Sequence, residues 1–297
     1  MWPFSKKIQV ITHDSHFHAD DVCAVTCLSL LYGNKIKVTR TRDPQKIERG
    51  DIVLDVGGKY DGVKFFDHHQ VGGAGRRDNT IPYASFGLIW KKFGKEITGS
   101  EAVAKRFDEV FVQSIDANDN GVSISEAKFP GVYPFKFDSF VFASNPTWKE
   151  SGVGHDEKFF ETVEFFKKII AREILFLQHE EEAREKVLTD YAKAEDKRII
   201  ILEKHYPVQD VFTAIPETLF YIYPRDGGIW GVRAVREAGA DYKNRKDFPA
   251  SWAGKRDAEL ATVTGVPDAI FCHNGRFMIV AGSKEGALTL AKKAIEG

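Results

Sequence analysis

Three apolar segments within the first 70 residues each run into aspartate and histidine side chains. Residues 7–11 precede His13, His18, Asp20 and Asp21; residues 51–54 precede Asp55; and residues 63–66 precede Asp67, His68 and His69. Hard divalent cations prefer carboxylate oxygens, and imidazole extends the choice to manganese, iron or zinc. The mixture of aspartate and histidine is therefore typical of a two-metal hydrolytic centre.

Each apolar segment has the length and composition of a buried strand. Ligand and catalytic groups gather at the carboxyl ends of strands in open α/β sheets. Neighbouring residues of an extended chain point to opposite faces, so one of His68 and His69 can ligate a metal while the other faces a substrate. An isolated histidine pair is more often simply half-exposed at the surface. The two other segments nevertheless favour a site here.

Four groups of polar residues follow one another in a fixed order along the first 120 residues. They are His13-x4-His18-x-Asp20, Asp55 before Val56-Gly57-Gly58, Asp67-His68-His69, and Asp116 in Asp-Ala-Asn-Asp-Asn-Gly. This order resembles the four motifs of the DHH phosphoesterases. Within them, the chain is similar to the melanocyte proliferating gene (MYG-one) family of metal-dependent hydrolases. Other short motifs outside these four groups also resemble that family. They are Arg40-Thr41-Arg42-Asp43-Pro44, Asn145-Pro146-Thr147-Trp148, Trp252-x-Gly-x-Arg256-Asp257 and Glu285-Gly286-Ala287-Leu288.

The resemblance covers nearly the whole chain and implies a metal-dependent phosphodiesterase. It implies a 3′-5′ exonuclease that acts on RNA or another oligonucleotide through a hydroxide activated by two divalent ions, manganese first and magnesium as the alternative. By the same resemblance, one metal takes His13, His18 and Asp55, and the other takes Asp20, Asp55, His68 and Asp116. Two further acidic residues, Asp21 and Asp119, are given other roles. Asp21 is either a ligand or a charge at a helix amino terminus, and Asp119 supports Asp116.

The resemblance also implies roles for the remaining polar residues. Asp55 bridges the metals, Asp67 orients a histidine, and His69 faces the phosphate and stabilises its developing charge. Substrate is held by His69, Arg42, Arg256, His273 and Ser283. Relatives often carry a Gly-Gly-Gly-His stretch near the carboxyl end, whereas residues 277–282 of this chain depart from that pattern.

A cluster of basic and aromatic residues supports a nucleic-acid contact in the second half. Between Arg225 and Arg256 there are eight basic and four acidic residues, and four aromatic side chains are interleaved: Trp230, Tyr242, Phe248 and Trp252. Such a mixture can hold phosphates and stack bases. The alternative is an ordinary charged surface with core aromatics, and the residues alone do not separate the two.

The order of elements predicts an α/β fold with two sheets. Residues 36–41 add a fourth strand to the three above, and residues 19–31, 85–93 and 101–115 have helical patterns, whereas residues 123–150 have the pattern of a loop. A mostly parallel sheet flanked by helices is therefore expected over 1–150, a helical connector over 151–196, and a smaller α/β domain over 197–297. The family resemblance implies that the first part is the metal-binding catalytic domain and that the last part binds substrate.

The composition bounds the remaining possibilities. A formal net charge of -1 from 42 basic and 43 acidic residues means that contact with nucleic acid depends on local clustering. Three cysteines form no paired framework, which is typical of a reducing compartment. We find no secretory signal and no membrane-spanning run, so a cytoplasmic protein without membrane partners is expected. The chain can still form an oligomer.

Two alternative functions are carried forward. One is a hydrolase of small phosphates, such as a pyrophosphatase or a cyclic-dinucleotide phosphodiesterase. The other is a metal-stabilised binding protein that retains the fold without turnover. A cleft for several nucleotides favours the exonuclease, and a closed cationic pocket favours the small phosphate.

Overall fold

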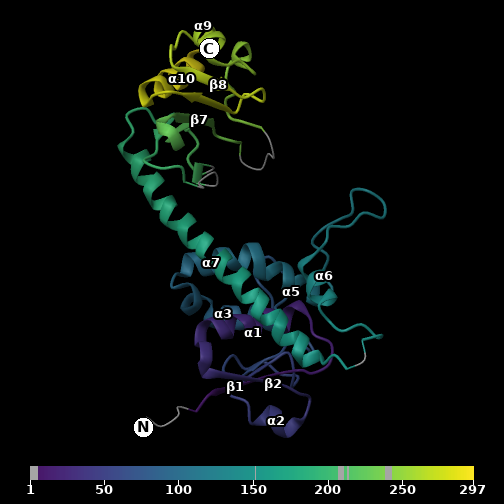
Figure 1. Cartoon of the computed structure of the whole chain (residues 1–297). Coiled ribbons are helices and arrows are strands. Elements are labelled where there is room, and N and C mark those ends of the chain that lie inside the picture. The colour runs from purple at the N-terminus through teal and green to yellow at the C-terminus, as the bar shows by residue number, and fades with distance from the viewer. Residues whose placement is uncertain (1–5, 151, 207–210, 213, 238–242) are drawn as a thin grey trace. The chain divides into compact units, whose positions relative to one another are not determined.

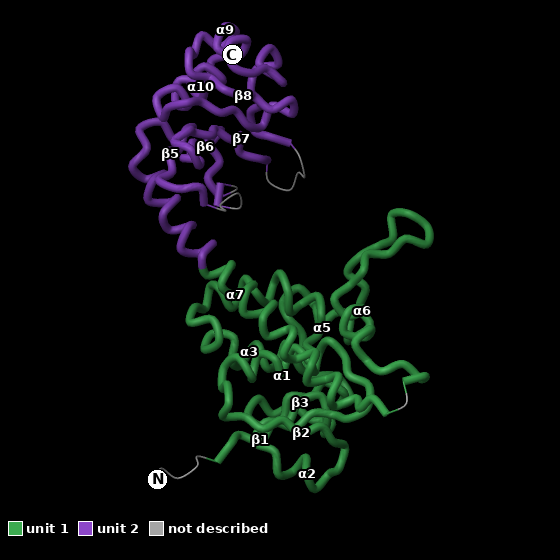
Figure 2. The backbone as a smooth tube through the Cα atoms, in the orientation of Figure 1, with its two compact units in different colours: residues 1–178 green, residues 179–297 purple. Residues whose placement is uncertain are grey.

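The computed structural model describes residues 6–150, 152–206, 211–212, 214–237 and 243–297. The chain divides into two compact units, residues 1–178 and 179–297, drawn in different colours in Figure 2. The division falls inside helix α7 (His155–Lys193), which lies within the helical connector predicted over 151–196. The predicted division at residues 150 and 196 stays a prediction.

Unit 1 is built on a parallel sheet. Among the residues described, its strands lie in the order β2-β1-β3-β4. They are β1 (Ile8–Thr12), β2 (Ile36–Arg40), β3 (Ile52–Leu54) and β4 (Phe65–Phe66). Every neighbouring pair is parallel, so the carboxyl ends of all strands meet at one edge. The prediction of an α/β fold with a parallel sheet flanked by helices is confirmed.

Alternating side chains of these strands bury both faces of the sheet. Val10, Leu54 and Phe66 belong to a large core with the helices of unit 1, whereas Ile11, Val53 and Phe65 pack with Ile47 of the short helix α2 in a smaller one. Figure 1 shows α2 on one side of the sheet and α1 and α3 on the other. The helices before α7 are α1 (Ala19–Tyr32), α2 (Pro44–Glu48), α3 (Ser85–Thr98), α4 (Glu101–Phe107), α5 (Gln113–Asp119) and α6 (Phe137–Ala143).

Three local predictions for unit 1 were wrong. Val63 is 72% exposed and lies outside β4, because the Asp61 carboxylate accepts hydrogen bonds from the backbone N–H groups of residues 63, 64 and 65 and forms a turn there. Asp116 and Asp119 lie inside α5 and not after a helix, since a π-helical turn, Asp108–Val112, joins α4 to α5. Helix α6 forms within the segment predicted to be a loop.

Unit 2 contains a mixed sheet with the strand order β5-β6-β7-β9-β8 among its described residues. Strands β5 and β6 are parallel and the other neighbours are antiparallel. Buried side chains of this sheet pack against α10 on one side and against the end of α7 on the other. The elements are β5 (Ile199–Ile201), β6 (Phe220–Pro224), β7 (Trp230–Ala234), α9 (Asp257–Thr264), β8 (Ala269–Cys272), β9 (Met278–Ala281) and α10 (Lys284–Glu296).

Helix α1 is buried almost all round, and Cys23 and Cys27 lie in the core as free thiols. Burial raises the pKa of the Cys23 thiol well above its ordinary value and that of Cys27 too. These cysteines are therefore packing residues and not metal ligands. Among the described helices, none is long and apolar enough to cross a membrane.

Candidate metal centre

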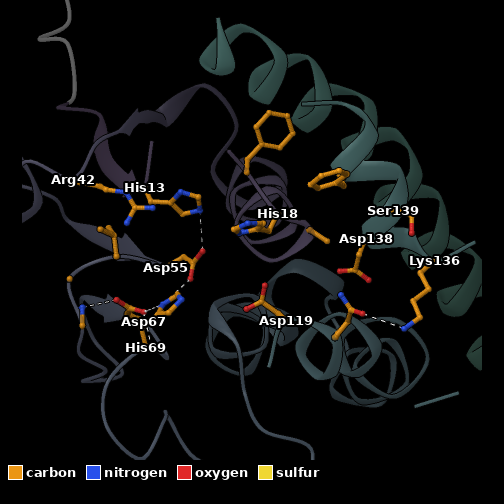
Figure 3. A pocket seen from close by; sticks show the side chains of 17 residues that line it. His13, His18, Arg42, Asp55, Asp67, His69, Asp119, Lys136, Asp138 and Ser139 are labelled. Carbon is orange, nitrogen blue, oxygen red and sulfur yellow. Dashed lines mark hydrogen bonds and ion pairs between the residues drawn. The ribbon is translucent and has the colours of Figure 1, made fainter. Parts of the chain in front are cut away.

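The carboxyl edge of the parallel sheet opens into a cavity of about 860 Å³. His13 directly follows β1, Asp55 follows β3 and Asp67 follows β4, and all three line this cavity. Figure 3 shows them across the cavity from Lys136 and neighbouring residues of α6. Parallel strands thus place at one edge three groups that are up to 54 residues apart in the sequence.

Asp55 lies at the centre of the buried polar groups. Its Oδ2 is 3.3 Å from Nε2 of His13, and its Oδ1 is 3.4 Å from Nε2 of His68 and 3.5 Å from Nδ1 of His69. Burial alone would raise the pKa of Asp55, but the close contacts with the imidazole rings of His13 and His68 outweigh it and hold the pKa below its ordinary value. The carboxylate is therefore charged and shared between two groups of ligand-type side chains.

The backbone at Asp55 has a left-handed conformation, with φ at 54°. Such a conformation is uncommon for a residue with a Cβ, although aspartate tolerates it better than most. Gly57 and Gly58 also have positive φ, and the N–H of Gly58 donates to Oδ2 of Asp67 over 2.6 Å. The turn after β3 therefore links Asp55 to the strand that ends in Asp67.

The first group of candidate ligands contains His13, His18 and Asp21, whose ligand atoms lie within 4.8 Å of one another. Nδ1 of His13 is 2.9 Å from the carbonyl oxygen of Asp14, so a proton at Nδ1 can be donated there and Nε2 is left as the electron-pair donor. Nε2 lies 3.3 Å from Oδ2 of Asp21. Both atoms are buried without a hydrogen-bond partner among the described residues. That arrangement suits a cation.

The second group contains Asp20, His68 and Asp119, with Asp55 beside it. Nε2 of His68 is 3.0 Å from Oδ2 of Asp119. Asp20 is held by the start of α3, whose backbone N–H groups at Ser85 and Phe86 donate to its carboxylate. Burial and the charges of Asp119 and Asp55 raise the pKa of Asp20 well above its ordinary value. A concentration of carboxylates this dense is costly without a compensating cation.

The carboxylates that surround His13 and His68 also shift the pKa of these two histidines. Burial alone would lower the pKa of His13 and of His68, but the surrounding carboxylates outweigh it and raise the values to about 9 and about 11. Metal ligation requires neutral imidazole, so a cation would displace these protons.

The described residues form a third group of candidate ligands, Asp55, His68 and His69. Asp116 lies outside all three groups. Its Oδ2 is 2.7 Å from Nη1 of Arg77, and its Oδ1 accepts the backbone N–H of Gly87 over 3.0 Å. A Cβ at position 87 would stand 1.8 Å from that carboxylate, which explains why glycine is needed there. Burial raises the pKa of Asp116 to about 7 despite the charge of Arg77. The geometry assigns Asp116 to Arg77 and places Asp119 beside His68.

Arg77 joins the loop after β4 to the helices that carry the site. Its guanidinium pairs with Asp108 in the π-helical turn as well as with Asp116, and it lies over the ring of Tyr83. Removal of a partner from a buried ion pair leaves an uncompensated buried charge, which costs about 3–5 kcal/mol. We therefore expect Arg77→Met to lower the free energy of unfolding by that amount in urea.

Arg76→Met is the matched control for Arg77, because the neighbouring arginine is exposed and donates only to the carbonyl of Thr80 in the described contacts. The double variant Arg77→Met/Asp116→Asn should recover part of the loss, since the fully buried side chain at position 116 is then uncharged and only Asp108 lacks its ion-pair partner. Equal stability of the Arg76 and Arg77 variants would show that the ion pair does not hold this part of the fold.

Asp67 and His69 form a separate pair at the cavity wall. Nδ1 of His69 lies 2.8 Å from Oδ1 of Asp67, and the hydrogen bond that the Asp67 carboxylate accepts raises the pKa of His69. The side chain of His69 is 62% exposed, whereas that of Asp67 is 2% exposed. His68 and His69 were predicted to point to opposite faces, but both reach Asp55 and they differ in exposure. The pair can present a cationic imidazole to an anion in the cavity.

The predicted substrate residues divide between the units. Arg42 lines the cavity and lies 3.3 Å from the carboxylate of Asp14. His69, described above, also belongs to unit 1, and the remaining three predicted substrate residues belong to unit 2. Arg256 lies over the ring of Phe271, and the ring of His273 packs against that of Phe277. Ser283 begins α10, where its Oγ accepts the N–H of Gly286 and donates to Asp268.

The basic and aromatic cluster of unit 2 is partly core. Phe248 and Trp252 are buried, so their aromatic character is explained by packing. Trp230 is partly exposed. Tyr242 and Asp241 lie outside the described residues. Only part of this predicted surface is therefore available to a ligand.

Sequence reasoning missed one wall of the cavity. Lys136, Ser139 and Phe142 line it from α6, in a segment predicted to be a loop. The run Phe137-Asp138-Ser139-Phe140-Val141-Phe142 carries an apolar spacing that is compatible with a short helix, but the prolines on both sides obscure it. Asp21 and Asp119 were noticed in the sequence, yet their contacts with His13 and His68 appear only in three dimensions.

Residues 9–295 match the family model MYG1_exonuc, described as an uncharacterised protein family, UPF0160. The chain belongs to this MYG1 family. Relatives include a MYG1 protein of Schizosaccharomyces pombe, 32% identical over 97% of this chain and 98% of the relative. A MYG1 protein of Saccharomyces cerevisiae is 32% identical over 97% and 95%. The human MYG1 exonuclease is 27% identical over 96% of this chain and 85% of its own length. The MYG1 resemblance predicted from the motifs is confirmed.

Proposed function

We propose that this chain is a metal-dependent exonuclease that hydrolyses phosphodiester bonds, with RNA as substrate and 3′-5′ direction. The observation that carries the proposal is the position of Asp55, whose two carboxylate oxygens face separate groups of mostly buried aspartate and histidine side chains in an open cavity. Mammalian relatives carry the name exonuclease, which supports a nucleic-acid substrate. We place the protein in the cytoplasm and the catalytic unit among the DHH phosphoesterases as parts of the same proposal.

The donor set determines which metals the centre would hold. It consists of aspartate oxygens and imidazole nitrogens, which suit manganese or magnesium. We propose that one cation is held by His13, His18 and Asp21, the other by Asp20, His68 and Asp119, with Asp55 between them. This set replaces Asp116 of the earlier expectation with Asp119 and adds Asp21.

Metal ions at such a centre lower the pKa of water and neutralise charge on a phosphate. The chain itself supplies the positioning. The contact of Nδ1 of His69 with Asp67 raises the pKa of the ring, and a protonated His69 would donate a hydrogen bond from Nε2 to a phosphate oxygen in the cavity. Arg42 and Lys136 both line the same cavity and can meet neighbouring phosphates. These cations orient a phosphodiester whose cleaved bond lies over Asp55.

The function is tested by incubating manganese-loaded protein with RNA and DNA oligonucleotides of matched sequence, labelled at either end, and with pyrophosphate. We expect stepwise release of nucleotides from the 3′ end of RNA. Products that shorten from the 5′ end would reverse the direction, faster cleavage of DNA would change the substrate, and release of phosphate from pyrophosphate alone would indicate the small-phosphate hydrolase. No turnover of any substrate would favour the binding protein.

The revised ligand set predicts different behaviour for two nearby aspartates. Asp119→Asn should lower manganese content and reduce turnover about 10- to 100-fold or more, while the free energy of unfolding of the metal-free protein is kept. Asp116→Asn should chiefly lower stability, because it weakens the buried pair with Arg77. Elemental analysis and urea unfolding of both variants measure the contrast. If Asp116→Asn lowered manganese content and Asp119→Asn lowered only stability, Asp116 and not Asp119 would be the metal ligand.

A further inference from the structure

Residues 127–137, which extend from the segment after α5 to the first residue of α6, carry four aromatic side chains and two lysines but no acidic residue, and Glu126 and Asp138 flank them. We call this segment the arm. Phe137 anchors its end, since the ring packs against Phe111 and Phe166. Phe129, Tyr133 and Phe135 are 63%, 74% and 77% exposed. In Figure 1 the chain between α5 and α6 projects from the helical side of unit 1 as an open loop.

Three large exposed aromatic side chains on one loop require an explanation. In the described part of the chain no aromatic ring or cation lies against Phe129, Tyr133 or Phe135. Apolar surface left in water is unfavourable, and contiguous patches of it mark binding sites. The one aromatic residue of the arm that does pack, Phe137, is at its base. The contrast indicates that the other three are presented to a ligand.

The arm is continuous with the cavity of the metal centre. Lys136 lies in the arm and lines the cavity, where its Nζ is 3.4 Å from Oδ1 of Asn118. Phe142, at the other end of α6, also lines the cavity and is 67% exposed. Figure 3 shows Lys136 and Ser139 across the cavity from Asp55 and Asp67. Exposed aromatic side chains therefore begin at the rim of the cavity and continue along the chain.

We propose that the arm and Phe142 form a binding site for nucleic-acid bases that begins at the rim of the hydrolytic cavity and extends outside it, on which unpaired bases of an oligonucleotide stack. Aromatic side chains interleaved with basic residues are suited to single strands, because every base has a face to stack and every linkage carries a negative charge. Lys128 and Lys136 would meet the phosphates. A lipid surface could meet the exposed rings, but only a chain-like polyanion extends from them to Lys136 and Phe142 in the cavity. The inference rests on the proposed function.

The test compares substrates of different length. A dinucleotide occupies the cavity alone, whereas a 12-nucleotide single strand also reaches the arm. Tyr133→Ala/Phe135→Ala should weaken binding of the 12-mer by about 10- to 100-fold in fluorescence anisotropy and raise its KM, because two stacking faces are lost. Hydrolysis of the dinucleotide should be unchanged. The matched control is Phe160→Ala/Phe176→Ala, which removes two exposed aromatic rings of α7 that do not line the cavity.

Several results would overturn the base-binding site. They are unchanged 12-mer binding by the arm variant, an equal loss for both lengths, and an equal loss in the control variant. Loss of binding to phosphatidylserine vesicles, or of a dimer in sedimentation, with 12-mer binding intact, would assign the arm to a membrane or to a second copy.

The experiments distinguish failure of the base-binding site from failure of the proposed function. A wild-type protein that binds the 12-mer through the arm but cleaves nothing would refute the exonuclease and leave the site standing. A wild-type protein that cleaves, with an arm variant indistinguishable from it on every length, would refute only the site. A wild-type protein that neither binds nor cleaves would refute both.

Discussion

Asp55→Asn is expected to reduce phosphodiester hydrolysis by at least about a thousandfold while the fold is kept. Asp55 approaches both histidine groups, so the substitution removes one negative charge from both proposed coordination spheres. Loss of a centre that activates water costs several kcal/mol of transition-state stabilisation, and each 1.36 kcal/mol is tenfold in rate. Single-turnover rates and circular dichroism of the variant measure the two parts of this expectation.

The control for Asp55→Asn is Asp78→Asn, the same chemical change at an exposed position of unit 1 outside the candidate ligand groups of the described residues. Its activity should match that of the unaltered protein. Near-normal turnover by a folded Asp55→Asn protein would rule out the shared carboxylate and with it the proposed centre.

Removal of divalent metal is expected to abolish activity and to lower stability together. About two manganese ions per chain should be found by elemental analysis of reloaded protein, given the two ligand groups. Each cation neutralises buried carboxylates, so binding favours the folded state. At a free metal concentration 100 times the dissociation constant, one site contributes about 2.7 kcal/mol. The midpoint of thermal unfolding should then rise by about 5–10 °C.

Calcium provides the comparison for the metal experiment. It prefers more oxygen ligands than these groups offer, so it should raise the unfolding midpoint less than manganese and restore little activity. Full activity of protein with less than about 0.1 metal ion per chain would contradict metal dependence. A single manganese ion with full activity would retain the metal but remove one of the two ligand groups from the proposal.

The edge of the parallel sheet was predictable because short apolar strands end in residues that have no reason to follow a strand except chemistry. Isolated strands alternating with helices imply parallel pairing, and parallel pairing places His13, Asp55 and Asp67 at one edge. The residues at the floor of the cavity were therefore predictable from the sequence. Membership of the MYG1 family was carried by the order of the same residues.

The contacts of Asp116 with Arg77 and of Asp119 with His68 were not predictable in the same way. The π-helical turn at Asp108–Val112 adds a residue to one helical turn, so side chains after it are rotated relative to a regular helix. A helical sequence pattern with a period of 3.6 residues therefore does not predict which face of the helix a residue after this turn occupies. As a result Asp116 faces Arg77 and Gly87, and Asp119 reaches His68.

The wall formed by α6 was missed for a different reason. Seven residues give too few turns for a periodic pattern, and packing of Phe137 and Val141 into the core stabilises the helix in place of intrinsic propensity. Tertiary contacts of this kind leave almost no local signal. The cavity residues on α6 therefore required the structure.

The left-handed backbone at Asp55 has a consequence for protein engineering. Asparagine and glycine adopt this conformation with little strain, whereas alanine and especially β-branched residues do not. Position 55 is therefore constrained twice, once by charge and once by chain geometry. In a library designed to give the cavity a new reaction, hydrophobic replacements at this position would damage the turn as well as the chemistry. A redesign should retain Asp, Asn or Gly here and introduce its new functional groups from the wall formed by α6.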